Sequence, residues 1–156
     1  MEAAMALSGK NVILIGIDDN DESTYSLEWT FDHLLVSASR FRVVFIHVKV
    51  PARSVIRISG PVEKDQRKHA AAVQGRAREL CLRRQITDYE VEVVEGDPRT
   101  VLCDAVDKHH ADMLVVGSHG YGKLKRVILG SVSDYCAHHA HCSVLIVKKP
   151  KINSKK

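Results

Sequence analysis

Two groups of glycine and hydroxyl residues stand close together in the last third of the chain. An apolar run ends in Gly117-Ser118-His119-Gly120, and after nine intervening residues the chain reads Gly130-Ser131-Val132-Ser133. Glycine lets a ligand approach the backbone closely. A helix that begins at Ser131 would present free N–H groups and the positive end of its dipole. Phosphate is the natural candidate for such a site.

Each glycine group taken alone has an ordinary alternative explanation. Gly-x-x-Gly is common in turns, and Gly130-Ser131 could be a turn followed by a helix cap. The cationic side chains between the groups could approach a phosphate or only solvent, and solvent is favoured for each one taken singly: Lys123, Lys125 and Arg126. The two groups gain weight together because they flank one predicted crossover, and because Asp18 closes the first predicted strand.

Short apolar runs alternate with helical patterns along the whole chain. We expect strands at 12–17, 42–50, 89–95, 112–116 and 143–148. We expect a first helix capped by Asp21 or Ser23 and running to about Ser37. A long connection after Pro51 should lead to a helix over about 63–84, whose apolar face comprises Ala72, Val73, Ala77, Leu80 and Cys81.

The remaining helices complete an alternating order of strands and helices. Asp97 and Pro98 are typical of an N-cap and a first helical residue, and that helix should end near His109 and His110. A last helix is expected over 131–139. Strands that alternate with helices predict an α/β fold, an open parallel sheet with helices on both faces.

Several other classes of protein and site are disfavoured. No P-loop string occurs, and neither a dinucleotide fingerprint nor an ATP-pyrophosphatase loop follows the first strand. The net charge of +4 is mild, so we expect no nucleic-acid partner. No apolar run approaches the roughly 20 residues that span a bilayer. With four cysteines, no CxxC pair and no signal peptide, we expect a cytoplasmic protein, one that could also be nuclear, whose thiols are reduced and mostly buried.

The histidine groups at His109-His110 and at 138–141 look like metal ligands. They fall, however, at the C-termini of predicted helices, where a polar or cationic side chain complements the dipole. No Cys/His spacing in the chain matches a zinc site. We therefore expect no protein-held metal.

The spacing Gly117-x2-Gly120-x9-Gly130-Ser131 resembles the nucleotide-binding signature of the universal stress protein family. The strings "LEWTFDHLL" and "GDPRTVLCDAV" are similar to the small, single-domain plant-type members. The resemblance covers about residues 10–149 of a single domain 1–156, with flexible tails at 1–9 and 150–156. It implies a Rossmann-like, five-stranded parallel sheet of order 3-2-1-4-5, similar to the adenine-nucleotide α-hydrolase group.

The resemblance also implies how a nucleotide would bind. An acid at the end of the first strand, here Asp18 after Ile17, would lie near the adenine and ribose. The base would contact the backbone after the second strand, at Val48. The ribose and phosphates of ATP, ADP or AMP, with Mg²⁺ accompanying the phosphates, would lie along Gly117, Ser118, His119, Gly120, Gly130, Ser131, Val132 and Ser133. Ser131 would donate its N–H and hydroxyl, and Ser133 would add a second hydroxyl.

Three functions remain open at this point. The first is an adenine-nucleotide-binding sensor or switch in a stress response, with chaperone-like activity as an accompanying role. The alternative is an enzyme, a slow Mg²⁺-dependent ATPase or nucleotide hydrolase, although no convincing set of nucleophile, base and orienting residue is present. The third, a scaffold that has lost nucleotide binding, is disfavoured by the intact glycine spacing and Asp18. The apolar edge strand 143–148 indicates a homodimer.

Overall fold

Five parallel strands form a single sheet. The structure, a computed structural model, describes residues 9–51, 61–118 and 129–150, without the side chains of 37–39 and 61–64. The sheet order is β3-β2-β1-β4-β5, which confirms the order implied by the resemblance. The strands are β1 (Asn11–Gly16), β2 (Phe41–Lys49), β3 (Tyr89–Glu95), β4 (Met113–Gly117) and β5 (Ser143–Val147).

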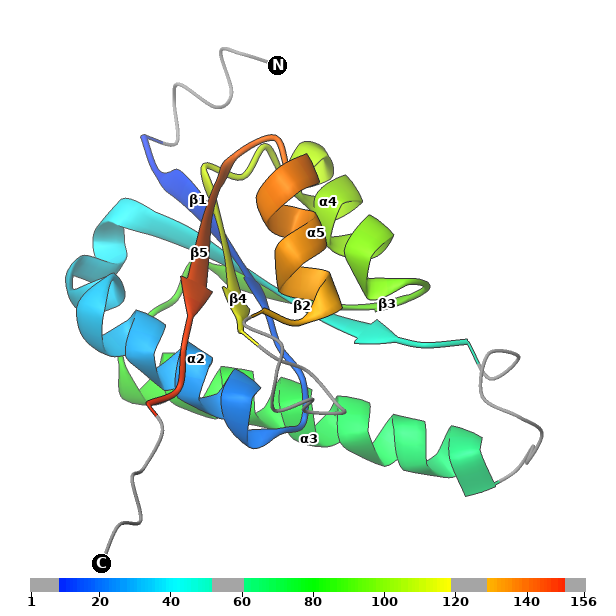
Figure 1. Ribbon diagram of the computed structural model, residues 1–156. Coiled ribbons are helices and arrows are strands. Elements are labelled where there is room, and N and C mark those ends of the chain that lie inside the picture. The colour runs from blue at the N-terminus through cyan, green and yellow to red at the C-terminus, as the bar shows by residue number, and fades with distance from the viewer. Residues whose placement is uncertain (1–8, 52–60, 119–128, 151–156) are drawn as a thin grey trace, which may run out of the picture.

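Helices cover both faces of this sheet. In Figure 1, α2 and α3 lie against one face, whereas α4 and α5 lie side by side on the other. The helices are α2 (Asp21–His33), the short 3₁₀ helix η1 (Leu35–Arg40), α3 (Pro61–Arg83), α4 (Pro98–His109) and α5 (Ser131–His139). Each predicted strand and helix is therefore present, with its ends shifted by a few residues.

The central strands are apolar on both sides because both sides are covered. Successive side chains of a strand point to opposite faces. Ile13 and Phe45 accordingly pack toward α2 and α3, in a core that includes Phe31. Leu14 and Val44, one residue away in each strand, pack toward α4 and α5. Each face of the sheet thus has its own buried core.

The start of α2 differs from the prediction. Its N-cap is Asn20, whose side chain accepts the Ser23 N–H at 2.8 Å, so the expected cap at Asp21 or Ser23 was wrong. The Ser23 hydroxyl instead accepts the N–H of Asp18 at 2.7 Å. The Ser23 hydroxyl is therefore used by the preceding turn and does not cap the helix.

Two further details of the helices differ. Helix α2 ends at His33 rather than near Ser37, and the chain continues in η1, which still buries Leu35. The buried face of α3 includes Ala70 but not Ala72, which is exposed. The expectation that Ala72 belongs to this face was therefore wrong.

The start of α4 confirms the prediction. Asp97 is the N-cap, its carboxylate accepts the Arg99 N–H at 2.9 Å, and Pro98 follows as the first helical residue. Arg99 also holds the Asp97 carboxylate through its guanidinium, and these hydrogen bonds lower the pKa of Asp97. The cap therefore stays ionised at neutral pH.

All four cysteines are free thiols that pack as small apolar side chains. Burial raises the pKa of Cys81 and of Cys136 to about 12. Burial also raises the pKa of the half-buried Cys103 and Cys142. At neutral pH these thiols stay protonated, which makes them poor nucleophiles. Within the described residues no helix is both long enough and apolar enough to cross a bilayer.

Two glycines give a paired test of this fold. Gly96 has φ +154°, and a Cβ there would lie 2.8 Å from Val101 Cγ2. Gly75 lies within α3, where a Cβ would meet nothing within 4 Å. We expect Gly96→Ala to lower the free energy of unfolding by about 1–3 kcal/mol through strain and overpacking. Gly75→Ala should raise it by about 0.5–1 kcal/mol. Urea denaturation measures both, and a shift of the same sign in the two variants would contradict the described backbone.

Candidate functional site

The carboxyl ends of the strands form one edge of the sheet, and those of β1 and β4 lie side by side within it. These strands are paired from Ile13↔Met113 to Ile15↔Val115, although they are far apart in sequence. The sheet grows from β1 toward β2 in one direction and toward β4 in the other, so the strand order reverses at this pair. In open parallel sheets, ligands bind beyond the carboxyl ends of the strands at such a point.

A buried carbonyl connects β4 to the start of α5. The Ser118 N–H donates to Val147 O at 3.1 Å, which continues the ladder with β5. The Ser118 carbonyl accepts the Gly130 N–H at 2.6 Å and the Ser133 hydroxyl at 3.0 Å. Ser118 is only 3% exposed. These bonds hold together the two ends of segment 119–129, so we call them the Ser118 latch.

The latch fixes the direction in which α5 begins. Gly130 is the N-cap, with φ −71° and ψ 164°, and it makes no side-chain cap. The first helical bond runs from the Asp134 N–H to Gly130 O at 3.0 Å. The backbone N–H groups of Ser131, Val132 and Ser133 therefore precede the helical ladder. Together with the dipole, they form the kind of helix start that binds a phosphate.

The Ser133 hydroxyl has a different role from the one expected. It is 2% exposed and donates to Ser118 O at 3.0 Å or to Gly130 O at 3.1 Å. A hydroxyl carries a single proton, so in this arrangement it has none left to donate to a phosphate. The hydroxyl thus helps to close the latch, and a binding role for Ser133 stays a prediction for its N–H alone. Ser131, by contrast, is exposed.

Asp18 occupies the expected position at the end of β1. Its N–H donates to the Ser23 hydroxyl at 2.7 Å, and its Oδ1 accepts the Asp19 N–H at 2.8 Å. The side chain is nevertheless 40% exposed. The carboxylate is therefore held in one orientation and can still accept a hydrogen bond from a hydroxyl of a ligand.

The backbone just before Asp18 is held by His47, a residue for which the sequence analysis predicts no role. His47 is buried, and its Nδ1 lies 3.1 Å from Ile17 O. Because a carbonyl can only accept, Nδ1 carries the proton. The same nitrogen is 4.0 Å from Asp18 Oδ1, too long for a direct hydrogen bond. Ile17 is itself buried, and its N–H donates to Ile46 O at 2.9 Å. The one available signal was a polar residue inside an apolar strand.

Helix α3 holds the turn that follows Asp18. Arg76 donates to Asp19 Oδ1 at 3.3 Å and to the Thr24 hydroxyl at 3.1 Å. His69 Nδ1 lies 3.6 Å from Asp19 Oδ2. These contacts could not be predicted from the sequence, because Arg76 and His69 belong to a different element from Asp19. They brace the β1–α2 turn from the side of α3.

Val48 lies within β2, not after it as expected. It pairs with Val94 of β3 on one side. On the other side, the described pairing of β2 with β1 reaches Gly16↔Ile46, followed by the Ile17 N–H bond to Ile46 O. Strand β2 thus continues past the end of β1. The Val48 backbone therefore lies beyond the carboxyl end of β1.

The described part of the chain would tolerate a side chain at Gly117. A Cβ on this residue would lie 3.5 Å from Glu22 O, an ordinary van der Waals contact. Packing within the described chain therefore does not explain a glycine here. The expected contacts of His119 and Gly120, and the open role of the cationic residues 123–126, lie outside the described residues.

A hollow of about 420 Å³ lies at the opposite end of the strands. It is lined by Val106, Asp107, His110, Ala111 and His141. These residues precede β4 and β5, so the hollow is at the amino ends of the strands. It includes no residue that the sequence assigned to binding.

The fold and this edge place the chain among the parallel α/β proteins whose ligand site lies at a reversal of strand order. A sequence model of the Universal stress protein family matches residues 11–148. The chain therefore belongs to the universal stress protein family.

Individual relatives agree with this assignment. The chain is 31% identical over 134 residues to an Arabidopsis thaliana universal stress protein A-like protein, and the match covers 80% of this chain and 77% of the relative. A crystal structure of an Arabidopsis thaliana family member with AMP bound superposes with a TM-score of 0.68 at 23% identity, covering 90% and 92% of the two chains. A universal stress protein in complex with cAMP gives 0.67 at 26% identity, covering 89% and 97%.

Two serines of α5 test the Ser118 latch. Ser133→Ala removes the buried hydroxyl and should lower the free energy of unfolding by about 1 kcal/mol. Ser131→Ala makes the same change at an exposed position of the same turn and should alter stability by less than about 0.5 kcal/mol. Urea denaturation compares the two variants. Equal effects would show that the hydroxyl bonds to Ser118 and Gly130 do not stabilise the fold.

Proposed function

We propose that the chain binds an adenine nucleotide, ATP, ADP or AMP, at the edge between β1 and β4. The observation that carries the proposal is the start of α5. Its leading N–H groups are held beside the end of β4 by the buried Ser118 carbonyl, and the Gly130 cap places no side chain in front of them. Such a helix start attracts a phosphate through directed N–H groups and the dipole.

The other parts of the nucleotide follow from the remaining contacts of this edge. The Asp18 carboxylate would accept hydrogen bonds from the ribose, because it is oriented and partly exposed. The adenine would lie against the Val48 backbone, beyond the end of β1. Gly117 would leave space for the ribose, with His119 and Gly120 continuing the loop. Mg²⁺ would accompany the phosphates of ATP or ADP, since this ion usually binds through substrate oxygens and water.

Two relatives support adenosine as the bound group. One Arabidopsis family member was crystallised with AMP, and a second family protein with cAMP. We propose that occupancy of the site changes the conformation or assembly of the chain, so that it acts in the cytoplasm as a sensor or switch in a stress response. A chaperone-like activity would be a consequence of that switch.

A substitution at the helix cap tests nucleotide binding. Gly130→Val places a branched side chain in front of the N–H groups, while φ −71° and ψ 164° are allowed for valine. We expect the Kd for ATP, ADP or AMP, measured by calorimetry with and without Mg²⁺, to rise at least about tenfold, equivalent to about 1.4 kcal/mol. Ala137→Val adds a branched side chain at the exposed far end of α5 and should leave the Kd unchanged. Wild-type protein that binds none of the three nucleotides would refute the proposal.

The alternative function is a slow Mg²⁺-dependent ATPase. Asp18 and His47 are an acid and a base that lie close together at this edge, 4.0 Å apart, but His47 is buried and directed at the Ile17 carbonyl. That geometry favours binding over general acid–base catalysis. Phosphate release by the wild-type protein, abolished in Gly130→Val and retained in Ala137→Val, would instead support the enzyme.

The exposed edge of the sheet supports a homodimer. Strand β5 is an outer strand of the sheet. Its half-buried residues are apolar: Val144, Leu145 and Ile146. Such an edge can pair with a second copy about a two-fold axis. We expect light scattering at micromolar concentration to give a dimer mass for the wild type and a monomer mass for Ile146→Lys. Val50→Lys, an apolar-to-lysine change after β2, should stay dimeric. A wild-type monomer would refute the dimer.

A further inference from the structure

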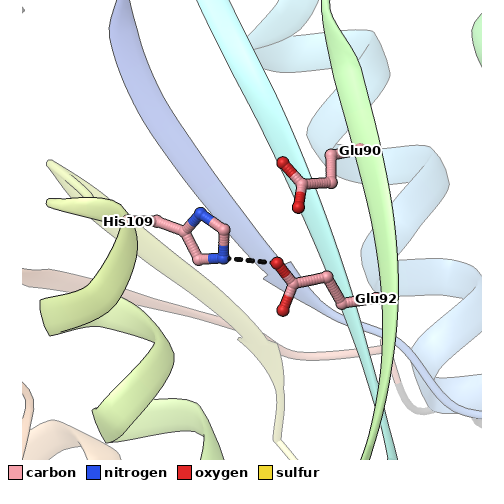
Figure 2. A group of neighbouring side chains, drawn as sticks. All are labelled: Glu90, Glu92 and His109. Atoms are coloured by element: carbon pink, nitrogen blue, oxygen red, sulfur yellow. Dashed lines mark ion pairs between the residues drawn. The ribbon is translucent and has the colours of Figure 1, made fainter.

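A group of three side chains far from the nucleotide edge has the composition of a metal site. Glu90 and Glu92 are two residues apart on β3, so both point to the face of the sheet that α4 covers. His109, in the last turn of α4, points toward them, as Figure 2 shows. One ligand atom from each residue lies within 4.8 Å of the other two.

The imidazole at the centre of this group lacks a proper hydrogen bond. His109 Nε2 lies 2.7 Å from Glu92 Oε1 in an ion-pair contact, yet this nitrogen has no hydrogen-bond partner among the described residues. The nitrogen is shielded from solvent, and the side chain is only 12% exposed. Buried polar atoms are normally satisfied. A cation between the nitrogen and the carboxylates would satisfy this one.

The electrostatic surroundings favour a cation. Two carboxylates face the last turn of α4, where the helix dipole is negative. Burial raises the pKa of Glu92, but its contacts with Glu90, His109 and Lys108 outweigh burial and lower the pKa.

Two cationic side chains already contact these acids, and a metal ion would have to compete with them. Arg42 donates to Glu90 Oε2 at 2.7 Å and is shared with Asp88 at 3.1 Å. Lys108 lies 3.4 Å from both oxygens of Glu92, and its side chain is 67% exposed. The lysine can turn into solvent, and the arginine keeps Asp88 if Glu90 rotates toward the histidine.

The donor set selects the class of metal. Mg²⁺ and Ca²⁺ prefer oxygen ligands, whereas an imidazole with two carboxylates suits Zn²⁺ and related ions. Ligand atoms around Zn²⁺ lie about 2.0–2.2 Å from the ion and hence about 3.0–3.5 Å from one another. The described separations need only modest side-chain rotation to reach these values. The half-exposed location leaves a further position for water.

We propose that Glu90, Glu92 and His109 form a zinc site that joins the β3 edge of the sheet to the end of α4. The site is separate from the nucleotide edge, because it lies on the outermost strand and involves none of the residues assigned to nucleotide binding. It also departs from the prediction that the helix-terminal histidines bind no metal. That prediction considered histidines and cysteines along the chain, whereas two of these ligands are glutamates of another element.

Calorimetry with Zn²⁺ tests the site in protein that has been stripped of metal with EDTA and then dialysed. We expect one ion to bind per chain. The Kd for Zn²⁺ should be at least about tenfold higher in Glu92→Gln and in His109→Gln than in the wild type. His110→Asn and Glu95→Gln are the matched controls and should bind as the wild type does. His110 is exposed with φ 50°, which asparagine tolerates, and Glu95 is an exposed residue of the same strand.

A spectroscopic measurement covers the case in which a variant fails to fold. Co²⁺ bound to the wild type should give visible d–d absorption without the near-ultraviolet band of a thiolate ligand. The presence of that band would move the site to the cysteines and refute the proposal. No Zn²⁺ binding, or equal affinity in Glu92→Gln and the wild type, would also overturn it. Gly130→Val should retain Zn²⁺ binding, which separates this test from that of the nucleotide site.

Discussion

The Ser118 carbonyl is the acceptor on which the candidate nucleotide site depends. A buried carbonyl has to be paired, and this one receives both the Gly130 N–H and the Ser133 hydroxyl. The Ser118 N–H is itself hydrogen-bonded to Val147 O of β5, so the start of α5 is held in place by the sheet. The leading N–H groups of a helix are useful to an anion only when they are preorganised in this way.

The acid on the other side of the edge is held by a second, independent set of contacts. Ser23 fixes the Asp18 backbone, His47 fixes the Ile17 carbonyl before it, and Arg76 braces Asp19 after it. These contacts come from α2, β2 and α3, so three elements converge on one turn. The pairing of β1 with β4 then sets the spacing between this turn and the latch. A ligand that touches both would sense the relative position of α5 and the β1–α2 turn, which is a physical basis for a switch.

The sequence predicts what depends on local spacing and does not predict what depends on packing between elements. The Asp97 cap, the alternating strands and the glycine spacing are local features, and the structure has the cap and the strands where they were expected. The cap of α2 was misplaced because several neighbouring polar residues can cap a helix, and Ser23 is engaged by Asp18. The partners of His109 could not be inferred from the chain, because they are brought to it by the crossover from β3 to α4.

The two edges of the sheet differ in a way that bears on assembly. Strand β3 carries Glu90 and Glu92, and the Glu90 ion pair continues through Arg42 to Asp88. Pairing a second chain along β3 would remove these charges from water. The ion pairs that they form stabilise the protein by only about 0–1 kcal/mol each, which is less than this desolvation would cost. Strand β5 carries Val144, Leu145 and Ile146 instead, and burying them is favourable. The charges on β3 therefore make pairing along that strand costly, which is one way in which an outer strand of a sheet is protected from association.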